Sequence, residues 1–405
     1  MFEISALQTL GMAAAVIMFG RILVQKIGFF DKYNFPAPVV GGLIVAIVLF
    51  ILKKNQILHV KFDLAFQEAL MIGFFASLGF GASWIALRAG GKSVISFLII
   101  CIGVLLLQNI LGVFAARLLG EPDLKGILAG SVALAGGPGT SLAFAPLFEQ
   151  AGIADAKTFG LACALGGILM GGIFGPPLGT YLIRKHSLKS SGVKAAPPVD
   201  ARLELGPTKD FSFNANVQEP EVNLLKHILG LIIVLGLGTI VSHFIKQTGI
   251  TLPIYIGSMF VAAIARNIDD KFSTFRLNEK LIDEIGSICL SLFIAASVMN
   301  LDLAQLQAGA FSLFFFLFVQ ALMVIVLSVT VIYWWTGKDF DAAVTSAGFA
   351  GFMLGTMANA MVNMNALTQK FGPARKAYLV VPIVGACFID FANAAFITFS
   401  INFLK

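Results

Sequence analysis

Long apolar runs, each about as long as a bilayer is thick, recur along the whole chain. About 20 residues of α-helix, rising roughly 1.5 Å each, cross a hydrocarbon core of ~30 Å. Two of the runs are short, and each begins beside a proline, Pro38 or Pro253, which suits the first turn of a helix. The pattern predicts an all-α membrane protein with ten spans, at about 6–26, 37–53, 67–87, 94–118, 156–183, 224–245, 252–267, 281–301, 312–335 and 377–402.

Two further apolar stretches are interrupted by glycines and do not fit a regular helix. They are LAGSVALAGGPGTSLAFAPLF, from Leu128 to Phe148, and TSAGFAGFMLGTMANAMVNM, from Thr345 to Met364. Glycine loosens a helix, and Pro138 removes an N–H and clashes with the preceding turn. Paired interruptions at corresponding positions of two halves indicate a transport site in a membrane protein.

Composition supports the membrane interpretation. Hydrophobic residues make up 58% of the chain, charged residues 12%, and the mean hydropathy is +0.89. Soluble domains carry about 25% charged residues. We interpret the net charge of +6 as cytoplasmic loop charge and not as a nucleic-acid interface, because no soluble face interleaves basic and aromatic residues.

The distribution of Lys and Arg favours one topology. More of them fall on the cytoplasmic side when both broken stretches enter and leave the bilayer on one side than when they span it. This arrangement places both termini outside. It places the polar segment 184–223 in the cytoplasm, where we expect a connector between the halves.

The two halves resemble each other. We expect a first repeat over 1–183, with a hairpin at about 124–149, and a second over 224–405, with a hairpin at about 339–369. Each half has five spans, an odd number, so the second repeat is predicted to be inverted and the hairpin tips to meet near the midplane. The matched positions are Pro38 and Gly42 with Pro253 and Gly257, Gln108 with Gln320, and Gly139-Thr140 with Gly355-Thr356.

The broken stretches supply groups that could bind a solute. A break frees backbone N–H groups and creates a new helix N-terminus, which we place after Gly139 and which attracts an anion. Tight helix packing by small residues is the alternative reading of the same glycines. The predicted substrate-binding residues are Gly137, Pro138, Gly139, Thr140, Ser141, Gly351, Gly355, Thr356, Asn359 and Asn363.

One acidic residue lies deep in a predicted span. Asp390 is near the middle of the last run, and Asn393 follows three residues later on the same helix face. An intramembrane carboxylate costs about 2.5–3.5 kcal/mol on insertion scales, so it indicates function. Sodium prefers hard oxygen ligands, and Asp390 and Asn393 could supply them. Gln108 and Asn109 are weaker candidates, because polar side chains also join helices.

Several runs, taken together, resemble the sodium/glutamate symporter family: AGGPGT, LAGS, RAGGK, LLQN, KFGPARKAYLVVPIVGACFID and FANA. The resemblance extends over essentially the whole chain. It implies a sodium-coupled secondary transporter of the bacterial inner membrane, with two inverted five-helix repeats, a re-entrant hairpin in each, and a homodimeric assembly. It also implies solute and sodium sites at the hairpin tips, in a domain that moves against a scaffold.

We therefore expect elevator-like symport of glutamate, or of a related amino acid or organic anion, with sodium as coupling ion and no cofactor. Met357 and Ala358 stand where the family usually has Thr-Pro, so the identity of the solute stays open. An uncoupled channel or exchanger for small organic anions is the alternative. An intramembrane enzyme is not supported, because no Ser/His or paired-Asp arrangement lies on neighbouring spans. Membrane lipid is the remaining expected partner.

Overall fold

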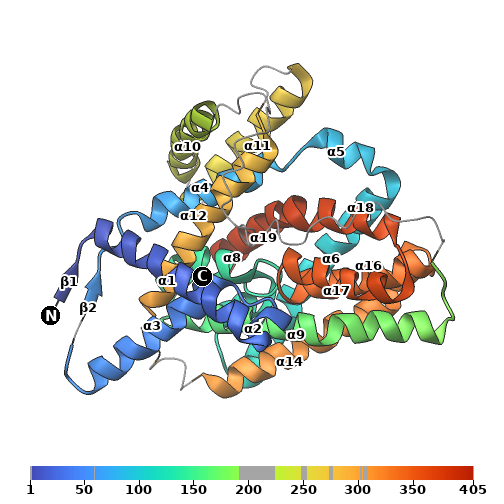
Figure 1. Cartoon of the computed structure of the whole chain (residues 1–405), viewed down its shortest axis with the longest axis horizontal. Coiled ribbons are helices and arrows are strands. Elements are labelled where there is room, and N and C mark those ends of the chain that lie inside the picture. Colours follow the sequence, from blue (N-terminus) through green and yellow to red (C-terminus); the bar gives the residue numbers. More distant parts are fainter. Residues whose placement is uncertain are drawn as a thin grey trace.

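The computed structural model describes residues 2–58, 60–190, 224–247, 253–272, 277–301, 303 and 309–404. Helices form nearly all of this part (Figure 1). Seven helical stretches are long and apolar enough to cross a membrane. They are Ala6–Lys26, Ala37–Lys54, Gly91–Leu119, Ala156–Lys185, Leu225–Gln247, Glu279–Met299 and Ala310–Thr336.

The first half of the chain begins with a short strand. Strand β1 pairs in parallel with β2, with Phe2 opposite Val60. The elements are β1 (Phe2–Ile4), α1 (Ala6–Lys26), α2 (Gly28–Lys32), α3 (Ala37–Lys54), β2 (Val60–Phe62), α4 (Gln67–Phe80), α5 (Trp84–Ala89), α6 (Gly91–Leu119), α7 (Asp123–Ile127), the π-helical turn η1 (Leu128–Val132), α8 (Gly137–Gln150) and α9 (Ala156–Lys185).

The second half has a similar order of elements. Three helices precede a long one, and a helix pair with a break in its middle follows. The elements are α10 (Leu224–Gln247), α11 (Ile254–Phe272), α12 (Glu279–Met299), α14 (Ala310–Leu327), η3 (Ser328–Ile332), α15 (Tyr333–Thr336), α16 (Phe340–Leu354), α17 (Met357–Phe371), α18 (Arg375–Ile383), η4 (Val384–Phe388) and α19 (Ile389–Phe403).

Three of the ten predicted runs differ from long apolar helices. The run at 67–87 is divided between α4, which ends at Phe80, and the short α5. The run at 252–267 lies on α11, which continues into the charged residues before Phe272. The run at 377–402 is divided by η4, just after Pro382, whose missing N–H weakens the helix there. Of the predicted linker 184–223, residues 191–223 lie outside the described part.

The helices pack in two groups. In one, α3 packs on α1 and α12, α4 packs on α11 and α12, and α11 packs on α10. In the other, α9 packs on α8, α14, α16 and α17, and α6 packs on α7 and α14. Helix α5 connects α4 in the first group to α6 in the second (Figure 1). The α1–α3 contact is close, because a Cβ placed on Gly41 would lie 2.2 Å from the Val16 carbonyl oxygen.

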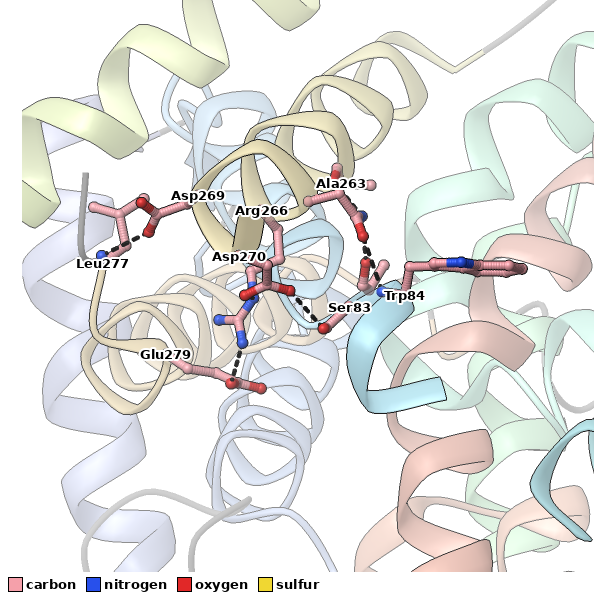
Figure 2. Close-up of polar contacts among 10 residues, drawn as sticks. Ser83, Trp84, Ala263, Arg266, Asp269, Asp270, Leu277 and Glu279 are labelled. Carbon is pink, nitrogen blue, oxygen red and sulfur yellow. Dashed lines mark hydrogen bonds and ion pairs between the residues drawn. The ribbon is translucent and has the colours of Figure 1, made fainter. Parts of the chain in front are cut away.

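Polar contacts fix the junction between α4 and α5 to α11. The Asn267 side-chain amide donates to the Ala82 carbonyl at 2.8 Å and accepts from the Trp84 N–H at 2.9 Å. Ser83 donates to Asp270, and Arg266 pairs with Asp270 and with Glu279 of α12, as Figure 2 shows. The end of α5 nearer the first group is therefore anchored.

Replacing Asn267 should loosen this junction. Asn267→Ala leaves the buried Ala82 carbonyl without its partner, and we expect a loss of about 1–3 kcal/mol of stability. Thermal unfolding of the purified protein, followed by tryptophan fluorescence, measures the effect. Asn55→Ala is the control, because Asn55 is exposed and donates only to the Ile51 carbonyl one turn earlier. Equal melting temperatures for the two variants would contradict the anchoring role.

Candidate transport site

The first broken stretch changes direction before α8. The chain leaves the helix after η1, passes through a turn over residues 133–136 and begins α8 at Gly137, which has φ +65°. The new helix therefore begins at Gly137, three residues before the predicted start after Gly139. The reason is that Pro138 sits in the first turn of α8, where its missing N–H costs nothing and its fixed φ favours the helix.

The second broken stretch is a pair of antiparallel helices. Helix α16 ends at Leu354, Gly355 is non-helical, and Thr356 caps α17 by accepting from the Asn359 N–H at 3.4 Å. The two helices are in close contact, because a Cβ placed on Gly351 would lie 2.6 Å from Cα of Ala360. Gly351 thus serves the packing of α16 on α17, while Gly355 and Thr356 form the break itself.

The two breaks meet. A methyl group placed on Gly137 would lie 3.4 Å from the Gly355 carbonyl oxygen and 3.5 Å from Cγ2 of Thr356. These residues are more than 200 positions apart in the sequence. The N-terminus of α8 therefore lies close to the N-terminus of α17.

Several residues predicted to bind solute also take part in helix packing, while Oγ of Ser141 and Oδ1 of Asn359 keep no hydrogen-bond partner among the described residues. Ser141 is fully buried against α9, where a Cβ on Gly160 would lie 2.4 Å from its hydroxyl. The Asn359 amide donates to the Ile168 carbonyl of α9 at 2.8 Å. The Asn363 amide donates to the carbonyls of Gly171 at 3.0 Å and Ala347 at 3.2 Å. These side chains hold α8 and α17 on α9.

The other residues predicted for the first break lie around its turn. Thr140 is buried and packs toward Gly136, where an added Cβ would lie 2.6 Å from the threonine Cβ. Gly139 faces the other group of helices, because an added Cβ would lie 2.9 Å from Cδ1 of Leu290 in α12. The tip of α8 therefore touches both groups.

A polar cluster surrounds Ser131, just before the first break. Gly130 is non-helical, with φ −92° and ψ −123°. The helix is therefore interrupted before Ser131, and the Ser131 N–H can bond to a group outside the helix. The Ser131 N–H donates to Oδ1 of Asn109 at 3.2 Å, and its carbonyl accepts from the Asn393 amide at 2.9 Å. Asn109 of α6 and Asn393 of α19, both predicted ion ligands, therefore meet at one residue. Ser131 itself was not predicted, although it ends the LAGS motif.

Buried oxygens beside this cluster lack hydrogen-bond partners within the described part of the chain. They are Oδ1 of Asn393, Oγ of Ser131 and Oε1 of Gln108. The Gln108 amide donates to the Met353 carbonyl at 2.9 Å, and the Gln320 amide donates to the Gln108 carbonyl at 2.8 Å. Gln108 thus joins the end of α16 to α14. Unpartnered buried oxygens suit a hard cation, which takes oxygen ligands.

Asp390 lies beside this region on α19. It is half-buried in the first turn of that helix, immediately after η4 and three residues before Asn393. Positions three apart share a helix face, so Asp390 is on the face whose Asn393 contacts Ser131.

Comparison with known proteins identifies the family. The model of the sodium/glutamate symporter family matches residues 2–373. A sodium/glutamate symporter of Escherichia coli (strain K12) is 38% identical over 395 residues, which cover 97% of this chain and 96% of the relative. One of Haemophilus influenzae is 36% identical over 402 residues and 98% of each chain. These relatives are named as symporters, which are transporters and not enzymes. The long apolar helices and this match together show that the chain is a membrane protein of the sodium/glutamate symporter family.

Proposed function

We propose that this protein is a secondary active transporter that moves glutamate, or a related amino acid or organic anion, together with sodium. The observation that carries the proposal is the contact between Gly137 and the Gly355–Thr356 break. Main chain that leaves the helix is tolerated at membrane depth only where it is buried in protein or lines a cavity. Two such segments in contact are suited to enclose a small solute, and the relatives are named for sodium and glutamate.

The sign of the solute's charge follows from the two helix N-termini that lie close together. Both α8 and α17 present their N-termini, where free N–H groups and the positive end of the helix dipole favour an anion. A carboxylate fits this position. A Cβ added to Gly137 would lie only 3.5 Å from Cγ2 of Thr356, so the gap between the tips is narrow and must widen slightly to admit a carboxylate.

For the coupling ion, we propose a sodium site at the Ser131 cluster. Asn393, Gln108 and Ser131 contribute neutral oxygens that lack partners within the described residues. Asp390 contributes the negative charge. Asn109 positions the main chain of Ser131 and adds its own oxygen nearby. The ion would stabilise the main chain before the first break and so favour solute binding there.

Helix length also bears on how the broken segments lie in the membrane. Helix α16 has 15 residues and so spans about 22 Å, short of a ~30 Å hydrocarbon core. We therefore propose that the α16–α17 pair and its counterpart α7–α8 are re-entrant, within two inverted repeats. We further propose a bacterial inner-membrane location, both termini outside, a homodimer, and alternating access by an elevator-like movement of the α9-centred group.

Transport should depend on sodium. Proteoliposomes with an inward sodium gradient should accumulate labelled glutamate above its external concentration, because the gradient drives the solute inward. The same vesicles with equal sodium on both sides are the control. Equilibration without accumulation would instead favour the uncoupled channel or exchanger.

The sodium ligands can be tested one at a time. Asp390→Asn and Asn393→Ala should each raise the sodium concentration for half-maximal uptake by about tenfold, the equivalent of about 1.4 kcal/mol. Asp63→Asn is the control, since Asp63 accepts a hydrogen bond only from the exposed Ala65 N–H. Unchanged sodium dependence in both test variants, with normal folding, would remove these residues from the site.

The contact between the breaks can be tested with a matched pair of glycines. Gly137 and Gly120 have similar left-handed conformations, with φ +65° and +69°, so alanine strains both equally. Only at Gly137 does the added methyl meet the other break, because nothing lies within 4 Å of a Cβ at Gly120. Gly137→Ala should therefore lower uptake about tenfold or more while Gly120→Ala stays near wild type. Equal uptake by the two folded variants would argue against a solute site between the tips.

A further inference from the structure

A cavity of about 210 Å³ lies among α6, α15, α16 and α18, away from the contact between the breaks. Lys92 of α6 and Lys376 of α18 line it, together with Ser96, Trp335 and Asp341, and the buried Phe97 forms part of its apolar wall. One water needs only about 10–15 Å³ of such space, so the cavity can admit a group of several heavy atoms.

Three helices begin at this cavity, and two of them are capped from within the protein. Asp339 accepts from the Ala342 N–H at the start of α16, at 2.7 Å. Oδ1 of Asp341 accepts from the N–H groups of Lys376 and Ala377 at the start of α18, at 2.8 and 3.1 Å. At the start of α6, the capping position is Gly90, which has no side chain to accept a hydrogen bond.

The two lysines differ in their partners. Lys376 donates to the Thr336 carbonyl at 3.1 Å. Lys92 has no hydrogen-bond or ion-pair partner among the residues that the structure describes. Among the described residues, Asp341 is the only carboxylate that lines the cavity, and it already accepts two N–H groups through one oxygen. The cavity therefore combines the exposed ammonium of Lys92, which no described residue neutralises, with the uncapped start of α6, and both favour an anion.

The surroundings place this cavity at the edge of the membrane. The apolar stretch Ala310–Thr336 ends here with Trp334 and Trp335, which are 61% and 66% exposed, and tryptophan is enriched at the membrane–water boundary. Trp335 donates to Ser96 at 2.6 Å, so one of these rings is fixed at the mouth. Ile95 and Ile99 of α6 are exposed on the adjoining surface.

We propose that this cavity binds the phosphate of an anionic phospholipid headgroup, with Lys92 and Lys376 as its charged contacts. A basic pocket between transmembrane helices at the cytoplasmic surface is the usual form of such a site. The exposed tryptophans and isoleucines beside the mouth favour a lipid, whose acyl chains they can contact, over a free phosphate. The headgroup would bridge α6 and the beginnings of α16 and α18, which flank the second broken segment.

Binding can be measured on the full chain in nanodiscs of phosphatidylcholine that contain increasing phosphatidylglycerol. The readout is the rise in melting temperature with phosphatidylglycerol content, because a ligand of the folded state stabilises it. Lys92→Gln with Lys376→Gln should require about tenfold more phosphatidylglycerol for the same rise. Lys26→Gln with Lys271→Gln removes the same charge from two other helix ends and should behave as wild type. Asp341→Asn, which keeps the Oδ1 acceptor, should bind more tightly.

Two results would overturn the proposal. One is an equal response to phosphatidylglycerol in the cavity variant and in the charge-matched control. The other is complete reproduction of the rise by soluble glycerol phosphate in pure phosphatidylcholine, which would assign the cavity to a free anion.

Discussion

Main chain that leaves the helix inside a membrane protein must find hydrogen-bond partners, and this constraint organises the transport site. Water is scarce there, and an unpaired N–H or C=O costs several kcal/mol. At Ser131 the N–H donates to Asn109 of α6, and the carbonyl accepts both from the Gly136 N–H and from the Asn393 amide of α19. One asparagine oxygen and one asparagine amide thus complete the hydrogen bonding of the residue that follows the kink at Gly130.

At the second break, glutamine side chains supply hydrogen bonds to the main chain. Gln108 reaches the Met353 carbonyl near the end of α16, and Gln320 reaches the carbonyl of Gln108 itself. The two glutamines that were matched between the halves of the sequence are therefore hydrogen-bonded to each other. Because Asn109 follows Gln108, adjacent residues of α6 support both broken segments.

Much of the fold was predictable because it depends on regular patterns. Apolar runs gave the long helices, and Gly-Pro and Gly-Thr marked where the two breaks fall, to within three residues at Pro138. Individual contacts were not predictable in the same way. Asn359 and Asn363 followed a break and suggested solute binding, yet their amides hydrogen-bond to carbonyls of α9 and α16. Ser131 escaped notice because a serine among small residues is typical of helix packing, and only the kink at Gly130 gives it a polar role.

Helix α9 decides what kind of movement the protein can make. It contacts α8 through Gly160, where Ser141 packs, and α17 through the carbonyls of Ile168 and Gly171. Moving one broken segment far from the other would expose these buried amides, at a cost of about 1–3 kcal/mol each. At the tips, even a Cβ added to Gly137 would make only ordinary van der Waals contact with Gly355 and Thr356, so separating the tips costs little. Within the proposed elevator-like movement, a slight opening at Gly137 with the α9-centred group moving as one body keeps these hydrogen bonds and is therefore the least costly route. Helix α5, anchored by Asn267 at one end and followed by α6 after Gly90, is one of the connections that such a movement would bend.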